Sequence, residues 1–205
     1  MALIAYWTLN ANSNATTGGK NGTDTDMAYT TASPFGTQAA TFNGSTSKIV
    51  IGDWFDAAAG DYSIEFWFKT NSTDTTIREM ITKNDYDAGG FRTLIYNNTI
   101  YGLVTGTVTA TFTNTTKWHH YILSRVYGAT NEVLTLYLDG TIIGTTTTAH
   151  SDVGNAQNLT FGQVQDTLGT YHFPFSGAIC EVKLWNEALT GFTTRQTNYA
   201  LNKML

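Results

Sequence analysis

Apolar and polar residues alternate along most of this chain with the period of two that is typical of β-strands. The clearest case is the segment Tyr62–Thr70. One of its faces carries Ile64, Phe66 and Phe68, and the other carries Glu65, Trp67 and Lys69. Because successive side chains of a strand point to opposite faces, this pattern predicts a strand with its aliphatic and aromatic face in a core.

Shorter segments of the same kind recur along the chain. We predict strands at residues 3–9, 38–42, 48–51, 77–83, 91–96, 99–104, 108–112, 118–126, 132–138, 141–146, 159–162 and 177–185. Turn dipeptides separate several of them, namely Asn43-Gly44, Asn97-Asn98 and Asp139-Gly140, which favour tight hairpins. The first of these turns is expected to join the strands at residues 38–42 and 48–51.

The end of the chain has a different pattern. Thr190 can cap a short helix over residues 191–201, with Phe192, Tyr199 and Leu201 on its apolar side. Many short strands with turn signals and almost no helix predict an all-β sandwich or barrel, and periodicity alone leaves both open. Neither an internal repeat nor a domain boundary is evident, so residues 1–205 are expected to form one domain.

Composition narrows the possible partners. The formal net charge is -5 and no run of Lys or Arg occurs, which argues against nucleic acid and against anionic membranes. No segment reaches the roughly 18 apolar residues of a membrane span, and the start Met1–Trp7 lacks the basic region of a signal peptide. The single cysteine, Cys180, precludes an intramolecular disulfide and is expected to be a small buried residue.

Seven segments together resemble the laminin-G-like domains of the concanavalin A-like lectin/glucanase superfamily. In chain order they are Ala5–Asn10, Asn14–Thr23, Phe42–Ser45, Tyr62–Thr70, Trp118–Tyr121, Leu136–Gly140 and Phe175–Leu189. The resemblance implies a two-sheet antiparallel jelly-roll sandwich over nearly the whole chain, with a short C-terminal helix added. In that frame Trp118 and Trp185 are expected to fill the core between the sheets.

Many relatives with these motifs hold a structural calcium ion. The resemblance places its carboxylates at two positions that are Ala15 and Cys180 in this chain. Calcium takes six to eight oxygen ligands, so we expect no bound ion and a loop held by hydrogen bonds between side chains and backbone. Asn14, Asn21 and Glu181 remain as weak candidate ligands if calcium is retained.

A catalytic or transition-metal site is not predicted. His119 and His120 are neighbours on one strand, so they point to opposite faces and cannot bind one ion. Glycoside hydrolysis by retention needs two carboxyl groups about 5 Å apart, whereas Glu65, Glu132 and Glu181 occur singly on their strands. The pair Asp85 and Asp87 lies in a glycine-rich turn. We therefore expect a protein without catalytic residues and without a cofactor.

Glycan binding is compatible with the sequence, because sugars stack on exposed aromatic rings. The candidate ligand-binding residues are Trp54, Tyr86, Tyr96, Tyr101, Tyr171 and His172. Surface aromatic residues can equally mark a protein interface.

Three functions compete. We favour a phage-like virion surface protein, such as a capsid decoration, fibre or attachment component, because the chain combines a compact domain with a charge-poor composition rich in Thr, Asn and Gly. A lectin or adhesin module of a cell surface is the alternative, and a glycan-active hydrolase or lyase is the weakest. The expected partners are other virion proteins or a cell-surface glycan, and the expected assembly is a homo-oligomer.

Overall fold

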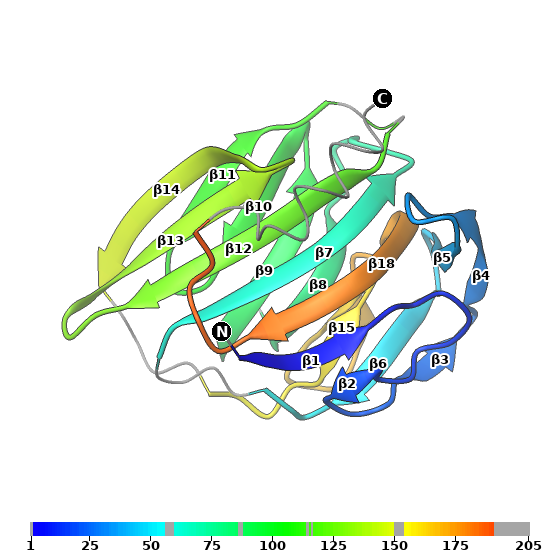
Figure 1. Cartoon of the computed structure of the whole chain (residues 1–205), viewed down its shortest axis with the longest axis horizontal. Helices are drawn as coiled ribbons and strands as arrows, with labels where there is room; N and C mark the ends of the chain where they lie inside the picture. Colours follow the sequence, from blue (N-terminus) through cyan, green and yellow to red (C-terminus); the bar gives the residue numbers. More distant parts are fainter. Residues whose placement is uncertain are drawn as a thin grey trace.

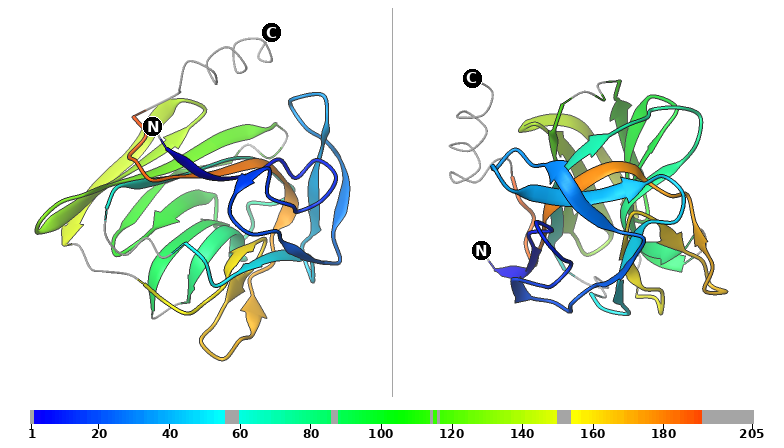
Figure 2. Two further views of the ribbon diagram at one scale, coloured as in Figure 1. Left: turned by 60° about the horizontal axis from the view of Figure 1, so that its bottom comes forward. Right: turned by 90° about the vertical axis from the view of Figure 1, so that its right-hand side faces the viewer.

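Two antiparallel β-sheets stack face to face and form a sandwich (Figures 1 and 2). The computed structural model describes residues 2–55, 60–85, 88–113, 115, 117–149 and 154–190. These residues contain strands and turns and no helix, which confirms the all-β jelly-roll sandwich. The helix predicted over 191–201 lies outside the described residues. No helix of the described residues is long and apolar enough to cross a membrane.

The first sheet, called sheet A below, has nine strands. They are β1 (Leu3–Trp7), β2 (Thr17–Gly18), β4 (Ala28–Ala32), β5 (Gln38–Asn43), β7 (Tyr62–Thr70), β12 (His119–Tyr127), β13 (Asn131–Leu138), β14 (Thr141–Ala149) and β18 (Ser176–Trp185). Their order is β14-β13-β12-β7-β18-β1-β2, and β5 and β4 extend the sheet from the other half of β18. The long strand β18 thus joins both ends of the chain in one sheet.

The second sheet, called sheet B, has seven strands in the order β11-β10-β9-β8-β15-β6-β3. They are β3 (Thr23–Thr25), β6 (Lys48–Gly52), β8 (Arg78–Asp85), β9 (Ala88–Tyr96), β10 (Thr99–Leu103), β11 (Thr107–Thr111) and β15 (Leu159–Phe161). A separate small hairpin consists of β16 (Val164–Gln165) and β17 (Tyr171–His172). Figure 2 shows it projecting from the body of the sandwich.

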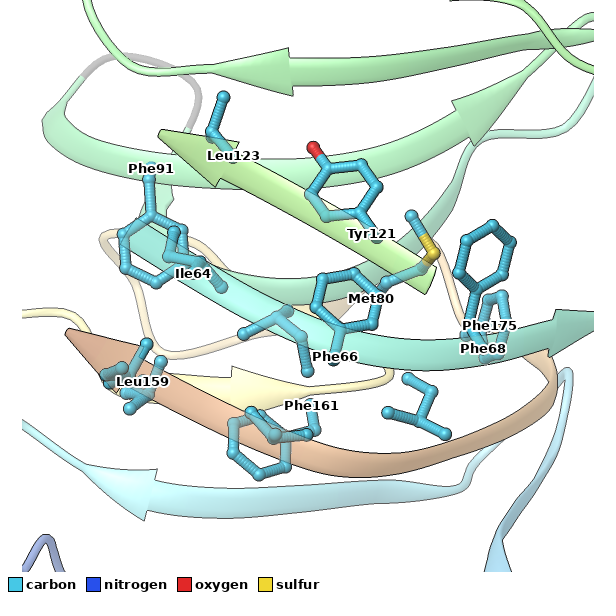
Figure 3. Close-up of a cluster of buried hydrophobic side chains, with 14 of the residues drawn as sticks. Ile64, Phe66, Phe68, Met80, Phe91, Tyr121, Leu123, Leu159, Phe161 and Phe175 are labelled. Atoms are coloured by element: carbon cyan, nitrogen blue, oxygen red, sulfur yellow. The ribbon is translucent and has the colours of Figure 1, made fainter. Parts of the chain in front are cut away.

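The core fills the space between the two sheets with aromatic and aliphatic side chains. Figure 3 shows part of it, with Phe66 and Tyr121 at its centre. Their rings stack with centroids 4.7 Å apart. Each large apolar side chain buried here contributes about 1.5–3 kcal/mol to folding. The face of β7 that was expected to be buried, with Ile64, Phe66 and Phe68, lies in this core, so that prediction is confirmed.

Two of the predicted turns are the hairpins that their sequences indicate. Asn97 and Asn98 have φ of 48° and 55° between β9 and β10, and Asp139 and Gly140 have φ of 50° and 79° between β13 and β14. Two consecutive residues with positive φ match the right-handed twist of the flanking strands.

The third turn is not a hairpin, so the prediction for Asn43-Gly44 is wrong. β5 belongs to sheet A and β6 to sheet B, so this turn carries the chain from one sheet to the other. The Asn43 Oδ1 atom accepts hydrogen bonds from the backbone N–H groups of Ser45, Thr46 and Ser47. The Asn43-Gly44 dipeptide therefore forms a tight turn, but a turn signal in the sequence does not determine which strands pair.

The core positions predicted for Trp118 and Trp185 are also wrong. Both rings are partly buried on the outer face of sheet A. The Trp118 ring packs beside Trp67, and its Nε1 donates to the Ala32 carbonyl at 3.0 Å. Trp185 lies opposite Ser63 on the outward side of β18. The alternation of side chains places both residues outward, whereas Trp7 is fully buried in the core with Trp54 packed against it.

Candidate functional site

The outer face of sheet B carries a surface built by the outward side chains of β8, β9 and β10. Strand register places Tyr101 opposite Leu94, and Leu94 opposite Glu79. A parallel row contains Leu103, Arg92 and Thr82. These residues alternate with core residues such as Ile95 and Ile100, so they point away from the core. We call the set Glu79, Arg92, Leu94, Tyr96, Tyr101 and Leu103 the outer face of sheet B.

Two tyrosines and Leu103 form the accessible part of this face. Tyr96 is 37% exposed, and Tyr101 is half-buried. Tyr96 pairs with Thr99, two positions before Tyr101, so the two tyrosines are diagonal neighbours, roughly 7–8 Å apart by sheet geometry. The Tyr101 carbonyl accepts a hydrogen bond from the Tyr121 hydroxyl at 2.9 Å, which fixes the backbone beneath the ring. This is a rigid aromatic platform of the kind on which a planar or sugar ring can stack.

A buried ion pair lies next to this platform. Arg92 Nε donates to Glu79 Oε1 at 2.9 Å, and Arg92 Nη2 donates to the same oxygen. Both side chains are buried, at 6% exposure for Arg92 and 0% for Glu79. Burial raises the pKa of Glu79 to about 7, although the charge and hydrogen bonds of Arg92 act in the opposite direction. Within the described residues, Glu79 Oε2 has no hydrogen-bond partner.

The raised pKa of Glu79 predicts a pH-dependent stability. The folded state holds the Glu79 proton more tightly than the unfolded state does, so this group favours folding below pH 4.5 and loses that contribution as the pH rises to about 7. The expected decrease in the free energy of unfolding is up to about 3 kcal/mol. Urea denaturation between pH 4.5 and 8 measures it, and Glu79→Gln should flatten the profile over this range. An unchanged profile in Glu79→Gln would contradict the assignment.

The β16–β17 hairpin covers one side of the outer face of sheet B. The Gln163 carbonyl, just before the hairpin, accepts hydrogen bonds from the Thr82 and Thr160 hydroxyls. The Glu79 N–H donates to the Phe173 carbonyl at 3.0 Å, on the other side of the hairpin. Val164 of β16 is itself buried. Both ends of the hairpin are therefore fastened to β8 or β15.

The tip of the hairpin is also ordered by its own hydrogen bonds. Asp166 Oδ1 accepts the backbone N–H groups of Leu168 and Thr170, and Asp166 Oδ2 lies 2.9 Å from His172 Nε2. The hydrogen bond from His172 and those from the backbone lower the pKa of Asp166. Tyr171 has the Lys48 ammonium 4.8 Å from its ring centroid. The hairpin is therefore a rigid border of the outer face and not a loose loop.

The structure brings four of the six predicted ligand-binding residues to this side of sheet B. Tyr96 and Tyr101 lie on the open part of the face, and Tyr171 and His172 lie on the bordering hairpin. Trp54 lies elsewhere, packed edge-on against Trp7 with ring centroids 5.9 Å apart. Tyr86 lies outside the described residues. The sequence reasoning did not select Arg92, Leu94 and Glu79, although Arg92 and Leu94 alternate with the apolar residues of β9 and could have been read as outward.

The three weak calcium candidates contact different partners. Asn21 Oδ1 accepts the Ala15 N–H at 3.0 Å, and the Asn14 N–H donates to Asn12 Oδ1. Glu181 accepts a hydrogen bond from the Tyr6 hydroxyl, and burial raises its pKa. Hydrogen bonds between side chains and backbone therefore hold the loop that contains Asn14 and Asn21, as expected. Among the described residues, no three His, Cys, Asp or Glu side chains are placed to hold a metal ion.

The two neighbouring histidines point to opposite faces of β12, as predicted. His119 packs in the core, with its ring 5.1 Å from Phe112 and its Nδ1 atom 2.7 Å from Asp139 Oδ2. His120 lies on the outer face of sheet A, where its Nε2 atom is 3.1 Å from Glu65 Oε1. The two rings therefore have separate structural roles.

The single glutamates are engaged in structural contacts. Glu65 is fully buried and also accepts hydrogen bonds from Lys183 and Trp185. Burial raises its pKa, but His120 and Lys183 outweigh this effect and leave the pKa below its usual value. Glu132 forms a buried ion pair with Arg125. The side chains of Asp85 and Asp87 lie outside the described part of the chain.

Comparison with known proteins identifies this architecture. A sequence model of the family described as "Concanavalin A-like lectin/glucanases superfamily" matches residues 42–191. Among solved structures, the chain is similar to domain 4 of AbnA, a GH43 extracellular arabinanase from Geobacillus stearothermophilus, in complex with arabinotriose. The TM-score is 0.71 with 19% identity, over 99% of this chain and 98% of that domain.

Two botulinum neurotoxin structures are similar to the same extent. The serotype C1 binding domain gives a TM-score of 0.70 at 16% identity, over 100% of this chain and 52% of that one. The neurotoxin DC binding domain, in complex with SialylT, gives 0.67 at 13% identity, over 99% and 51%. The chain thus spans about half the length of these toxin domains. Comparison with curated proteins gives no match.

Proposed function

Because the chain belongs to the concanavalin A-like lectin/glucanases superfamily, we propose that it is a non-catalytic module that binds carbohydrate on the outer face of sheet B. The observation that carries the proposal is the platform of Tyr96 and Tyr101, held by the pairing of β9 with β10 and by the hydrogen bond from the Tyr121 hydroxyl to the Tyr101 carbonyl. Aromatic rings offer a flat apolar face to a sugar, and a few placed polar groups then fix its orientation.

The surroundings of the platform suit a sugar ligand. Thr107 and Thr109 of β11 lie opposite Leu103 and Tyr101, so their exposed hydroxyl groups extend the face beyond the tyrosines. On the other side the hairpin presents His172, whose ring is paired with Asp166 and is partly exposed. A sugar stacked on Tyr101 would therefore find the threonine hydroxyls of β11 beside it for hydrogen bonding, and an oligosaccharide that continues across β9 and β8 would reach the His172 imidazole.

Two of the similar structures support the choice of ligand class. The arabinanase domain was solved with arabinotriose, and one of the toxin binding domains was solved with SialylT. Both are distant in sequence, so they support carbohydrate binding as a class and leave the sugar open. The glutamates that could serve in hydrolysis are buried in structural contacts, which supports binding without catalysis.

Replacing Tyr101 tests the proposal. Tyr101→Ala should weaken glycan binding about tenfold or more, because the loss of a stacked ring costs about 1.4 kcal/mol. A glycan array identifies the ligand, and isothermal titration with that glycan measures the affinity of both proteins. Arabinotriose and sialylated oligosaccharides are the first probes.

The matched control is Ile142→Ala. Ile142 is a 58% exposed apolar residue on the outer face of sheet A, so its removal should leave glycan affinity unchanged. Binding that survives in Tyr101→Ala but fails in Ile142→Ala would move the site to the opposite sheet. An array without any glycan bound would refute the proposed function.

The virion location stays a prediction from the sequence. None of the similar proteins described above is a virion component, and the fold serves many binding modules. Mass spectrometry of purified particles from the source tests it, since a virion component is found there in fixed proportion to the other coat proteins.

A further inference from the structure

The two free sheet edges on one side of the sandwich lie together, and the edge strand β14 is nine residues long. β14 is the terminal strand of sheet A and β11 is the terminal strand of sheet B. A Cβ atom added to Gly144 of β14 would come within 2.7 Å of Val108 Cγ2 of β11, so the two edges are in contact. In Figure 1 both strands lie at the same side of the molecule. Within the described residues, β14 pairs with β13 alone.

These edges lack the charged residues and prolines that normally prevent strand pairing between molecules. Natural sheets protect their edges with charged residues, proline, bulges or very short strands. The segments Thr141–Ala149 and Thr107–Thr111 contain no Lys, Arg, Asp, Glu or Pro. The register shift at Leu136/Tyr137 leaves Ile143 of β14 unpaired, so this edge strand has one bulge near its start, and the six residues from Gly144 to Ala149 pair without interruption.

The edges on the opposite side of the sandwich have this protection. β2 has two residues and β3 has three, including Asp24. β4 is followed closely by Pro34. The edge at β14 is therefore less protected against pairing with another strand than the edges on the opposite side are.

The outer surface next to β14 is also uncharged and partly apolar. Ile142 is 58% exposed and Val126 is 46% exposed. Thr145 and Thr147 point to the same outer face, opposite Thr135 and Val133. The protein as a whole carries a net charge of -5, so two copies repel each other except where both present an uncharged surface.

We infer that β14 pairs with β14 of a second copy of this chain, in an antiparallel two-fold arrangement that makes sheet A continuous across a dimer. An antiparallel pair of identical strands is self-complementary, because each residue meets the symmetric position of its partner. The six regular residues from Gly144 to Ala149 supply a ladder of hydrogen bonds, and threonines opposite one another stabilise such a pair. The protein is acidic and the β14 edge is uncharged. A second copy of this chain is therefore the partner that fits this edge best.

The dimer would have a consequence for ligand binding. The two-fold axis of an antiparallel strand pair is perpendicular to the sheet, so the outer faces of sheet B in both copies point to the same side. Two glycan sites on one side bind a multivalent surface more strongly than one site does. This consequence rests on the proposed function, whereas the dimer does not.

Light scattering coupled to size-exclusion chromatography tests the inference. The expected mass is that of two chains of 22.4 kDa. Thr145→Lys combined with Thr147→Lys should give a single chain, because four positive charges then face one another across the axis. Thr30→Lys, on the exposed side of β4 at the opposite edge, is the matched control and should remain a dimer. Wild-type protein with the mass of one chain at all accessible concentrations, or a double variant that stays dimeric, would overturn the inference.

Hydrogen exchange of the wild-type chain provides a readout that needs no variant. The amides of residues 144–149 should exchange more slowly at high protein concentration than at low concentration, because pairing with a second copy protects them. The amides of β4 should show no such dependence. Equal exchange of residues 144–149 at both concentrations would refute the dimer even if glycan binding is confirmed.

Discussion

Replacing Arg125 by methionine is expected to lower the free energy of unfolding by about 3–5 kcal/mol. Arg125 and Glu132 are both fully buried, and Arg125 Nη2 lies 2.7 Å from Glu132 Oε2. The guanidinium also lies 4.8 Å from the Tyr127 ring centroid and 5.4 Å from that of Tyr62. The substitution leaves the Glu132 carboxylate buried without its counter-charge, and this desolvated charge causes most of the loss.

A double variant separates the charge from the packing. Arg125→Met combined with Glu132→Leu removes both charges and keeps the volume, so it should regain most of the stability that the single variant loses. Urea denaturation of the wild type, both single variants and the double variant gives the coupling energy. A single variant that costs less than about 1 kcal/mol would show that the pair is solvated or that the site relaxes.

The long strands could be predicted from the sequence because the apolar side chains that face the core alternate with side chains of a different type on the other face. β7 occupies Tyr62–Thr70, the range expected from alternation, and β13 differs from its predicted range by one residue. In these strands every second residue contacts the same core. The alternation between core-facing and outward residues can therefore be recognised within any short segment of these strands.

The short polar strands could not be found in this way. β4 has the sequence Ala28–Ala32 with no residue fully buried, and β2 and β3 are two or three polar residues long. Their positions are set by pairing with β1, β5 and β6, which lie elsewhere in the chain. The turn at Asn43-Gly44 was misjudged for the same reason, since strand pairing is a long-range property.

The residue types of the candidate site could be predicted from the sequence, but the arrangement of these residues in space could not. Tyr96, Tyr101, Tyr171 and His172 stand out as aromatic residues near turns. Their arrangement depends on the register of β9 with β10 and on the hairpin that is fastened to β8 through Gln163 and Phe173. Trp54 has the same type of sequence context, and only its contact with Trp7 shows that it belongs to the core.

Replacing Trp7 by alanine is expected to lower the free energy of unfolding by about 3–5 kcal/mol. Trp7 is fully buried, and its ring lies edge-on to Trp54 at 5.9 Å and to Phe161 at 5.4 Å. Its Nε1 atom donates to the Lys20 carbonyl at 2.9 Å, so the substitution also releases the loop that leads from β2 to β3. The loss combines a large cavity with one unsatisfied carbonyl, and urea denaturation measures it.

Trp54→Ala separates the two interpretations of the second tryptophan. As a half-buried ring on Trp7, Trp54 should contribute about 2 kcal/mol to stability and nothing to glycan affinity. If Trp54 were a ligand-binding residue, its removal would lower the glycan affinity and leave the stability unchanged. Trp7→Ala and Trp54→Ala should therefore bind glycan as the wild type does at temperatures where they remain folded, whereas Tyr101→Ala should lose affinity at temperatures where it is fully folded. A Trp54→Ala protein of normal stability without glycan binding would place the ligand at the end of the sandwich near β6 instead of on the outer face of sheet B.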